Sequence, residues 1–459
     1  MRKEKMIGLL ALAATFLFAG CSGSVEIGPV PTITPRPTVT PAPTPTPVVV
    51  VQEQEEVKEV SVYETKKYKE YYEKENKLPQ LKEAYKDVFS IGLDASLIDI
   101  MDEKRQAIVK EQFNQLTIKE DLTPENIMDY ETAKVSEDKT RIPLNFSAAD
   151  TILKFAKDNN ISVMGPKLMT EATPEWAFSK DLDRNQVVVT TDEEGNEVTT
   201  IEYASAEVML ARMENYIKDV ITYCNTNYPG VVISWTVLDE PINAGETTET
   251  MYRANYWLKT IGDDYIVKAC EFARKYATAS QKLLLTQDAL DEEKTLKPSL
   301  VLINKLKDAK LIDGIGIKAH YSPNSPNVFN MEDMMKKLSA TGLDLHLTEY
   351  YVDCNEGNRG DLDKTDEERL ARGVKRSKAL MTNILNYDVK SNYDIKSISL
   401  EALTNDYADV NQPKDYIDHN TLEVKFGVQV VSFPCIFDED LNVSDVFFAF
   451  MGDATIKGY

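Results

Sequence analysis

Short apolar runs alternate with longer amphipathic segments along most of the chain. Eight runs are rich in Val, Ile and Leu and have the length of buried strands. Between them, several segments carry apolar residues at three- and four-residue spacing, as helices packed on one face do. The predicted strands are Val88–Asp94, Phe113–Ile118, Ile161–Leu168, Val231–Leu238, Lys282–Gln287, Asp313–His320, Asp344–Glu349 and Ser397–Leu403. The predicted helices include Ala148–Asp158, Ala206–Asn225, Asp264–Tyr276 and Pro298–Lys307. This alternation indicates a parallel α/β fold.

Eight strand–helix units predict a single (β/α)8 TIM barrel over residues 59–459. A doubly wound open sheet is the alternative, because the same alternation allows it. No glycine-rich phosphate loop follows the first predicted strand, which argues against nucleotide binding. Two short runs, Val187–Thr190 and Val198–Ile201, predict a β-hairpin inserted after the third strand.

The first 58 residues break this pattern. Residues 1–20 join a basic start to a short apolar stretch, as a secretory signal does. Phe18-Ala19-Gly20-Cys21 resembles a bacterial lipobox, which implies a lipidated Cys21; a plain cleaved signal is the alternative. Residues 21–58 contain alternating Pro and Thr, which predicts an extended linker. We therefore expect a protein on the bacterial cell surface, tethered to the outer face of the membrane through its lipid anchor only.

Composition excludes some classes of function. The formal net charge of -23 argues against a nucleic-acid partner. Besides Cys21, the cysteines form no CxxC pair and lie at no metal-ligand spacing from a histidine. They are Cys224, Cys270, Cys354 and Cys435. We predict buried thiols, with one disulfide left open, and we expect no metal, no cofactor and a monomer.

Two predicted strands end in carboxylates. Val231–Leu238 runs into Asp239-Glu240-Pro241, and the strand from Asp344 ends in Glu349. TIM barrels form their active sites at the carboxyl ends of the strands, so Glu240 and Glu349 are expected to face one another. Hydrolysis of a glycosidic bond requires two carboxyl groups that face one another across the bond. The alternative is two ordinary surface glutamates.

These segments resemble glycoside hydrolase family 10, the β-xylanases. Trp235–Pro241 is similar to the family's acid/base motif, and Leu347-Thr348-Glu349 to its nucleophile strand. Gly314–His320 is similar to its sixth strand. The resemblance implies that Glu240 is the acid/base, that Glu349 is the nucleophile and that His320 orients Glu349. It also implies retaining endo-β-1,4 hydrolysis of a plant-wall polysaccharide, xylan or a related β-glycan, through a glycosyl-enzyme intermediate.

Several positions depart from the family pattern. Asp239 stands where the family has Asn, and Glu401 aligns with a Trp that covers the reacting sugar. Lys167 lies in a third-strand motif that usually carries two His and a Trp, and Lys318 lies in the sixth-strand motif. Asp239 is either protonated, or accepts a hydrogen bond from the sugar, or is balanced by a cation such as Lys167 or Lys318.

These charges have a consequence for the substrate. Burying unpaired charges is costly, so we expect a substrate that satisfies some of them, such as a substituted or acidic glycan whose carboxylate pairs with a lysine. The alternative function is a surface lipoprotein that binds glycans on the same barrel and is catalytically weak or inactive.

Overall fold

The computed structural model describes most of the chain from residue 60 onward. The described residues are 60–61, 69, 73–185, 187–191, 197–243, 251–356, 361–391, 395–412, 415–418, 423–426, 430–451 and 455–456. The chain divides into two compact units, Met1–Gln54 and Glu55–Tyr459, and all described residues belong to the second. The predicted signal peptide, Cys21 and the linker to residue 58 lie outside the described residues.

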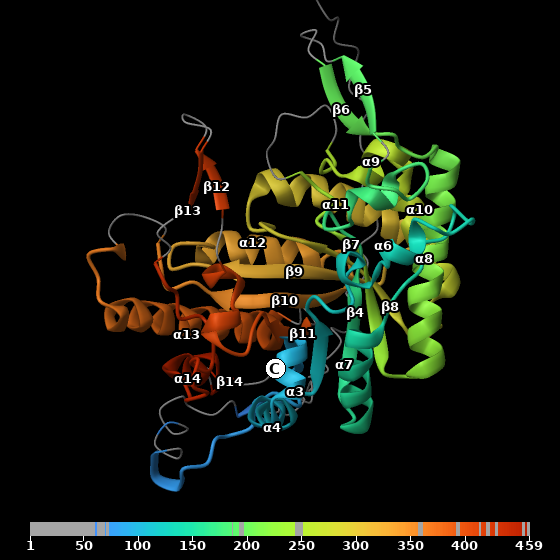
Figure 1. Cartoon of the computed structure of the whole chain (residues 1–459). Helices are drawn as coiled ribbons and strands as arrows, with labels where there is room; N and C mark the ends of the chain where they lie inside the picture. Colours follow the sequence, from blue (N-terminus) through green and yellow to red (C-terminus); the bar gives the residue numbers. More distant parts are fainter. Residues whose placement is uncertain are drawn as a thin grey trace, which may run out of the picture. The chain divides into compact units, whose positions relative to one another are not determined.

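Eight parallel strands close into a barrel (Figure 1). They follow one another around it in chain order, and the last pairs with the first. The strands are β2 (Ser90–Ala95), β3 (Gln115–Ile118), β4 (Ser162–Met169), β7 (Val232–Asp239), β8 (Lys282–Gln287), β9 (Gly314–Tyr321), β10 (Asp344–Val352) and β11 (Ile395–Leu400). Each overlaps one of the eight predicted strands, so the predicted TIM barrel is confirmed and the open-sheet alternative is wrong.

Helices surround the strands (Figure 1). The longer ones are α4 (Glu103–Gln112), α7 (Ser147–Asp158), α8 (Ala206–Asn227), α10 (Asp264–Tyr276), α11 (Glu293–Asp308), α12 (Val328–Ser339) and α13 (Asp366–Ser391). The shorter ones are α2 (Leu81–Ala84), α3 (Leu97–Met101), α5 (Pro124–Ile127), α6 (Tyr130–Ala133), α9 (Tyr256–Ile261), α14 (Asp445–Met451) and the 3-10 turns η1 (Glu175–Phe178), η3 (Asn405–Tyr407) and η4 (Asp409–Asn411).

Local sequence explains where the helices begin and what they bury. The Ser205 side chain accepts a hydrogen bond from the Val208 amide and so caps α8. The apolar face of α8 then packs on the barrel through residues such as Met213, Ile217 and Ile221. The predicted start of α11 at Pro298 is wrong, because the helix begins five residues earlier and keeps Pro298 inside it.

Among the described residues, three small antiparallel pairs lie outside the barrel. The predicted hairpin is confirmed as β5 (Val187–Thr191) paired with β6 (Glu197–Ile201), inserted between β4 and α8 (Figure 1). A second pair, β12 (Asp415–Asp418) with β13 (Glu423–Phe426), lies between β11 and α14. The third joins β1 (Val60–Ser61) to β14 (Thr455–Ile456) and so links the two ends of this unit. Both hairpin insertions follow the carboxyl end of a barrel strand.

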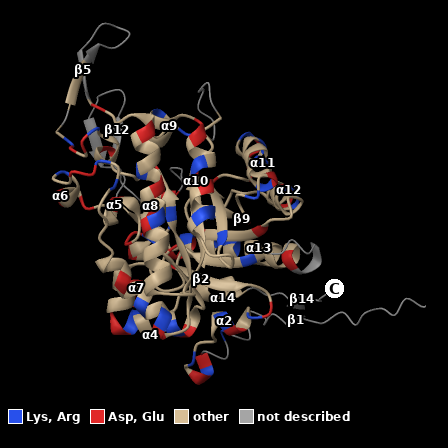
Figure 2. Cartoon of the chain, turned by 90° about the vertical axis from the view of Figure 1, so that its right-hand side faces the viewer, with Lys and Arg blue, Asp and Glu red and all other residues tan. Residues whose placement is uncertain are grey.

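The outer helices carry charges of both signs. Blue and red segments are interspersed along α4 and α8 (Figure 2). Within the described part of the chain, no helix combines the length and apolar character needed to cross a bilayer. Cys224, Cys270, Cys354 and Cys435 are buried and unbridged, which confirms the prediction of buried thiols.

Candidate active site

Glu240 and Glu349 stand at the carboxyl ends of two barrel strands. Glu240 directly follows β7, and Glu349 lies near the end of β10. Both residues have a left-handed backbone, with φ of 46° and 51°. The pairing of β10 with β9 shifts register between Thr348 and Tyr351, across Glu349. The strand is therefore locally distorted at the point where this carboxylate leaves it.

The Glu349 side chain reaches across the barrel. Its Oε1 lies 2.6 Å from Nζ of Lys167, which belongs to β4 on the opposite side of the barrel. Its Oε2 lies 3.7 Å from Nζ of Lys318 on the neighbouring strand β9. Burial by itself raises the pKa of Glu349, but the nearby positive charges, above all Lys167, hold that pKa well below its usual range. Glu349 is therefore an ionised carboxylate inside the mouth of the barrel.

His320 is the second neighbour that keeps Glu349 ionised. Its Nε2 lies 3.1 Å from Oε2 of Glu349, and its Nδ1 lies 3.7 Å from Oδ2 of Asp288. Burial opposes a charge on the imidazole, but the hydrogen bonds with Asp288 and Glu349 outweigh it and raise the pKa of His320 to about 9. The ring also stacks on Tyr351, with centroids 4.9 Å apart. At neutral pH His320 is a fixed cation against Glu349, where the resemblance placed it.

Asp239, the last residue of β7, is balanced by cations. Its Oδ1 lies 3.1 Å from Nζ of Lys318, and its Oδ2 lies 3.8 Å from Nζ of Lys167. The Thr286 hydroxyl also donates a hydrogen bond to Oδ1, at 2.8 Å. A side chain at Gly316 would collide with Thr286, since its Cβ would lie 2.3 Å from the Thr286 methyl. Of the three alternatives for Asp239, the geometry matches balance by the two lysines.

Glu240 is held by two cations, one on each oxygen. Nζ of Lys318 lies 2.5 Å from Oε1, and Nη2 of Arg253 lies 2.5 Å from Oε2. Because Lys318 also lies 3.7 Å from Glu349, one oxygen of Glu240 and one of Glu349 lie within about 6 Å of each other. That limit on one pair of oxygens admits the carboxyl separation of about 5–5.5 Å that retaining glycosidases have.

Asp94, at the end of β2, belongs to the same neighbourhood. It is buried, and its Oδ1 has no hydrogen-bond partner among the described residues. Burial and the negative charge of Glu349 raise the pKa of Asp94 to about 7. Sequence analysis did not predict a role for Asp94. The available signal was its position, because Asp94 is the last residue of a predicted strand, as Glu349 is.

Glu401 lies in a second cluster, at the end of β11. It is almost completely buried and pairs with Lys119, whose Nζ also lies 2.8 Å from Asp409. Burial raises the pKa of Glu401 to about 7 despite the lysine beside it. The position that the resemblance aligns with the family's Trp is thus occupied by a carboxylate in a buried ion pair, and this side chain has no ring face on which a sugar could stack.

The structure therefore brings most of the predicted site residues into one network. Asp239, Glu240, His320, Glu349, Lys167 and Lys318 contact one another directly, and Glu401 is in the separate cluster. Sequence analysis missed Arg253, which no pattern marks, and assigned no role to Asp288. Lys119, Lys167 and Lys318 each pair with carboxylates of the chain. The geometry therefore does not match the expectation of a lysine that is available to the carboxylate of an acidic substrate.

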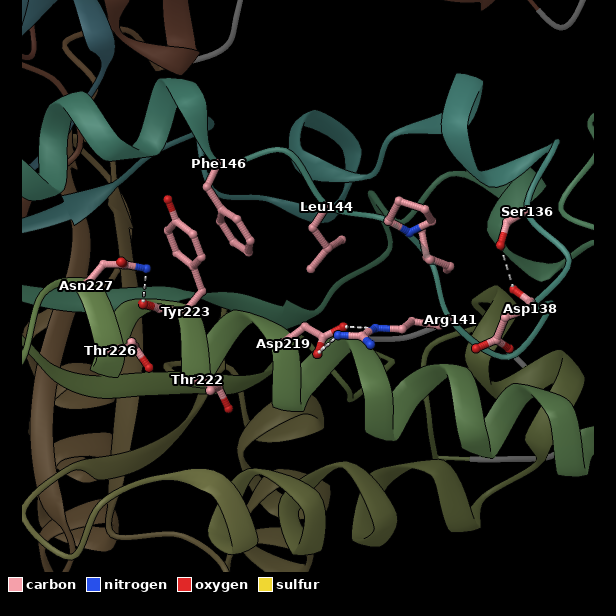
Figure 3. Close-up of a pocket in the computed structure, with 12 residues that line it drawn as sticks. Ser136, Asp138, Arg141, Leu144, Phe146, Asp219, Thr222, Tyr223, Thr226 and Asn227 are labelled. Carbon is pink, nitrogen blue, oxygen red and sulfur yellow. Dashed lines mark hydrogen bonds and ion pairs between the residues drawn. The ribbon is translucent and has the colours of Figure 1, made fainter.

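A pocket of about 560 Å³ lies elsewhere, between residues 136–146 and the second half of α8 (Figure 3). The stacked rings of Phe146 and Tyr223 lie in it, and Arg141 makes a two-point ion pair with Asp219 there. None of the network residues lines this pocket. Within the described residues, no group of His, Cys, Asp and Glu is arranged to hold a metal ion.

Comparisons with known proteins agree with this geometry. A family model described as "Glycosyl hydrolase family 10" matches residues 80–452. Endo-1,4-beta-xylanase B of Butyrivibrio fibrisolvens is 32% identical over 275 residues, which cover 59% of this chain and 40% of that protein. Endo-1,4-beta-xylanase A of Caldicellulosiruptor saccharolyticus is 33% identical over 299 residues, covering 63% of this chain and 76% of that protein.

Solved structures give the same picture of the fold. The crystal structure of an endo-1,4-beta-xylanase from Caldicellulosiruptor owensensis is 26% identical, with a TM-score of 0.59, and the match covers 82% of this chain and 99% of that chain. The present chain spans less than half the length of six of the curated relatives that it matches.

Proposed function

Since the chain belongs to glycosyl hydrolase family 10, we propose that it hydrolyses β-1,4-linked xylan, cutting within the chain and retaining the anomeric configuration. The observation that carries the mechanism is the limit of about 6 Å between the Glu240 and Glu349 oxygens, set by their shared partner Lys318. The names of the relatives, which are endo-1,4-beta-xylanases, support the choice of substrate.

In the first step, an oxygen of Glu349 bonds to the anomeric carbon while the bond from that carbon to the leaving oxygen breaks. Glu240 gives its proton to the leaving oxygen, which departs as a hydroxyl. In the second step, Glu240 takes a proton from water, the water oxygen bonds to the anomeric carbon, and Glu349 is released as a carboxylate. Lys167 and His320 keep Glu349 ionised, as a nucleophile requires.

Glu349 lies in the environment that this role needs. It is buried, so no bulk water competes for it, and its partners come from β4 and β9 and are fixed by the barrel. His320 acts through Glu349 and is a positioning residue. Asp239 and Thr286 extend the network on the side of Glu240.

The proposal is tested by measuring the reducing sugar released from a panel of β-glycans that includes xylan. The wild-type protein should release sugar from xylan, and Glu349→Gln should release none above background. A thermal melt of the variant shows whether the barrel remains folded. If the folded wild type leaves every β-glycan intact, the hydrolase proposal fails and a glycan-binding role takes its place.

We also propose that the protein is tethered to the outer face of a bacterial membrane through Cys21. The support is the sequence alone: a basic start, a short apolar stretch and Phe18-Ala19-Gly20-Cys21. The Pro- and Thr-rich residues that follow would act as a spacer between the lipid and the barrel.

A further inference from the structure

Both oxygens of Glu240 are occupied by groups that can only donate. Oε1 faces the ammonium of Lys318 and Oε2 faces the guanidinium of Arg253, each at 2.5 Å. Neither cation has a lone pair that could accept a hydrogen bond. Along these two contacts a proton on Glu240 would point at another proton, so a protonated Glu240 has to use one of the remaining lone-pair positions of its oxygens.

The proposed acid step is favoured when one of the two cations moves away from Glu240. Lys318 is fixed, because its side chain is only 6% exposed and also contacts Asp239 and Glu349. The Arg253 side chain is 30% exposed. Its other carboxylate partner, Glu171, is 63% exposed and lies 3.1 Å from Nη1. Arg253 is thus the cation that can leave.

Arg253 also stands on a definite side of the site. Of the two Glu240 oxygens, Oε1 shares Lys318 with the nucleophile Glu349, whereas Oε2 is held by Arg253. Because Glu240 gives its proton to the leaving oxygen, we assign Arg253 to the side of the glycan part that departs. The backbone N–H of Arg253 donates to the carbonyl of Pro241 at 2.9 Å, which anchors this residue next to the acid. Glu171, the partner of its second nitrogen, follows the end of β4.

We propose that Arg253 is a specificity-determining residue that releases Glu240 when it binds the carboxylate of a uronic acid side group on the leaving-group part of the glycan. This inference rests on the proposed hydrolase function. A guanidinium binds a carboxylate through two parallel hydrogen bonds, so a uronate replaces the partner that Arg253 gives up. A neutral glycan offers no such replacement, so Arg253 leaves Glu240 less often and cleavage is slower.

Three oligosaccharides with the same β-1,4-xylose backbone test this. One is unsubstituted, one carries a single uronic acid, and one carries the methyl ester of that uronic acid, which keeps the bulk and removes the charge. The wild-type protein should cleave the acid with a kcat/KM about tenfold higher than the ester or the neutral chain, the worth of one charge-assisted hydrogen bond. Equal rates on the acid and the ester would overturn the proposal.

Arg253→Gln supplies the matching change in the protein. Glutamine is uncharged, and its amide oxygen can accept a hydrogen bond from a protonated Glu240. We expect kcat/KM on the neutral oligosaccharide to rise and the preference for the acid over the ester to disappear. A fall on all three substrates by the same factor, with the acid preference kept, would instead make Arg253 a purely structural residue.

The control variant is Arg141→Gln. Arg141 also makes a two-point pair with a carboxylate, Asp219, but in the separate pocket of Figure 3. This substitution should leave kcat/KM on all three oligosaccharides, and the ratios between them, unchanged.

Calorimetric titration of the acidic and the esterified oligosaccharide into Glu349→Gln measures binding without cleavage. A binding preference for the acid without hydrolysis by the wild type would sink the proposed function alone, whereas hydrolysis without that preference would sink the role of Arg253 alone.

Discussion

Glu240 and Glu349 share a left-handed backbone, with φ of 46° and 51°, at the ends of β7 and β10. This conformation costs an L-residue other than glycine about 1–2 kcal/mol. Such strain persists only where the surrounding structure imposes it, and it gathers at functional sites. Here the ion pairs to Lys318, Arg253 and Lys167 hold the two side chains in place.

The short distance between these carboxylates predicts the stereochemistry of the reaction. We expect the first product released from a β-xylo-oligosaccharide to carry the β configuration at its new reducing end, because the limit of about 6 Å between one pair of the carboxylate oxygens admits the spacing of retaining enzymes. Proton NMR of the anomeric signals during the first minutes of the reaction measures the configuration of this product. An initial α signal would contradict a retaining mechanism.

Glu240→Gln should separate the acid role from the nucleophile role. Without a proton donor, kcat/KM on xylan should fall by about 100- to 10,000-fold. An aryl β-xyloside with a nitrophenolate leaving group needs no protonation, so kcat/KM on it should be largely kept. Glu349→Gln should abolish both activities. Equal losses on xylan and on the aryl substrate in Glu240→Gln would argue against Glu240 as the acid.

Lys167→Met removes the closest cation from Glu349. Because His320 and Lys318 remain beside Glu349, the loss is that of one charged partner, and we expect the free energy of unfolding to fall by about 1.5–3 kcal/mol. Urea denaturation at neutral pH measures it. The control is Lys154→Met, which breaks an exposed pair with Asp158 on α7 and should cost less than about 0.5 kcal/mol. If the free energy of unfolding falls by a similar amount in both variants, the Lys167–Glu349 pair stabilises the fold no more than an exposed ion pair does.

The raised pKa of His320 predicts how stability depends on pH. Its pKa is 6.5 in the unfolded chain and about 9 in the folded protein, so the folded state holds the proton more tightly. This contribution, about 3 kcal/mol, is complete below pH 6.5 and is lost as the pH rises through 9. Unfolding measured from pH 6 to 10 should therefore show a steeper decline for the wild type than for His320→Asn. Parallel curves would show that His320 is not bound as a cation.

Replacement of Cys21 tests the predicted anchor. Cys21→Ala removes the thiol that would carry the lipid, so the precursor should remain unprocessed or the protein should appear in the medium. Acyl chains provide membrane affinity of about 0.8 kcal/mol per buried CH₂, and nothing else in the predicted arrangement contacts the bilayer. Fractionation of cells expressing both forms measures the change, and an unchanged membrane fraction would rule out lipidation at this residue.

The sequence by itself determined the barrel and the positions of the two glutamates. Buried strands read as continuous apolar runs, and the helices between them read as amphipathic repeats, so all eight strands overlap their predictions. Because these are local patterns, they locate Asp239, Glu240 and Glu349 at strand ends without any knowledge of contacts. The same local logic failed at Pro298, because proline is typical of the first turn of a helix, whereas α11 begins at Glu293 and already buries Leu296 ahead of Pro298.

Only the tertiary structure decided which charges meet. Lys167 and Glu349 are far apart in sequence and lie on opposite sides of the barrel, and no periodicity reports that their side chains touch. Arg253 lies outside every strand, and its contact with Glu240 depends on the path of the chain after β7. The left-handed φ of the two glutamates is likewise a feature that no sequence pattern marked. Sequence patterns encode which face of an element is buried, whereas the pairing of charges depends on distances that exist only once the barrel has closed.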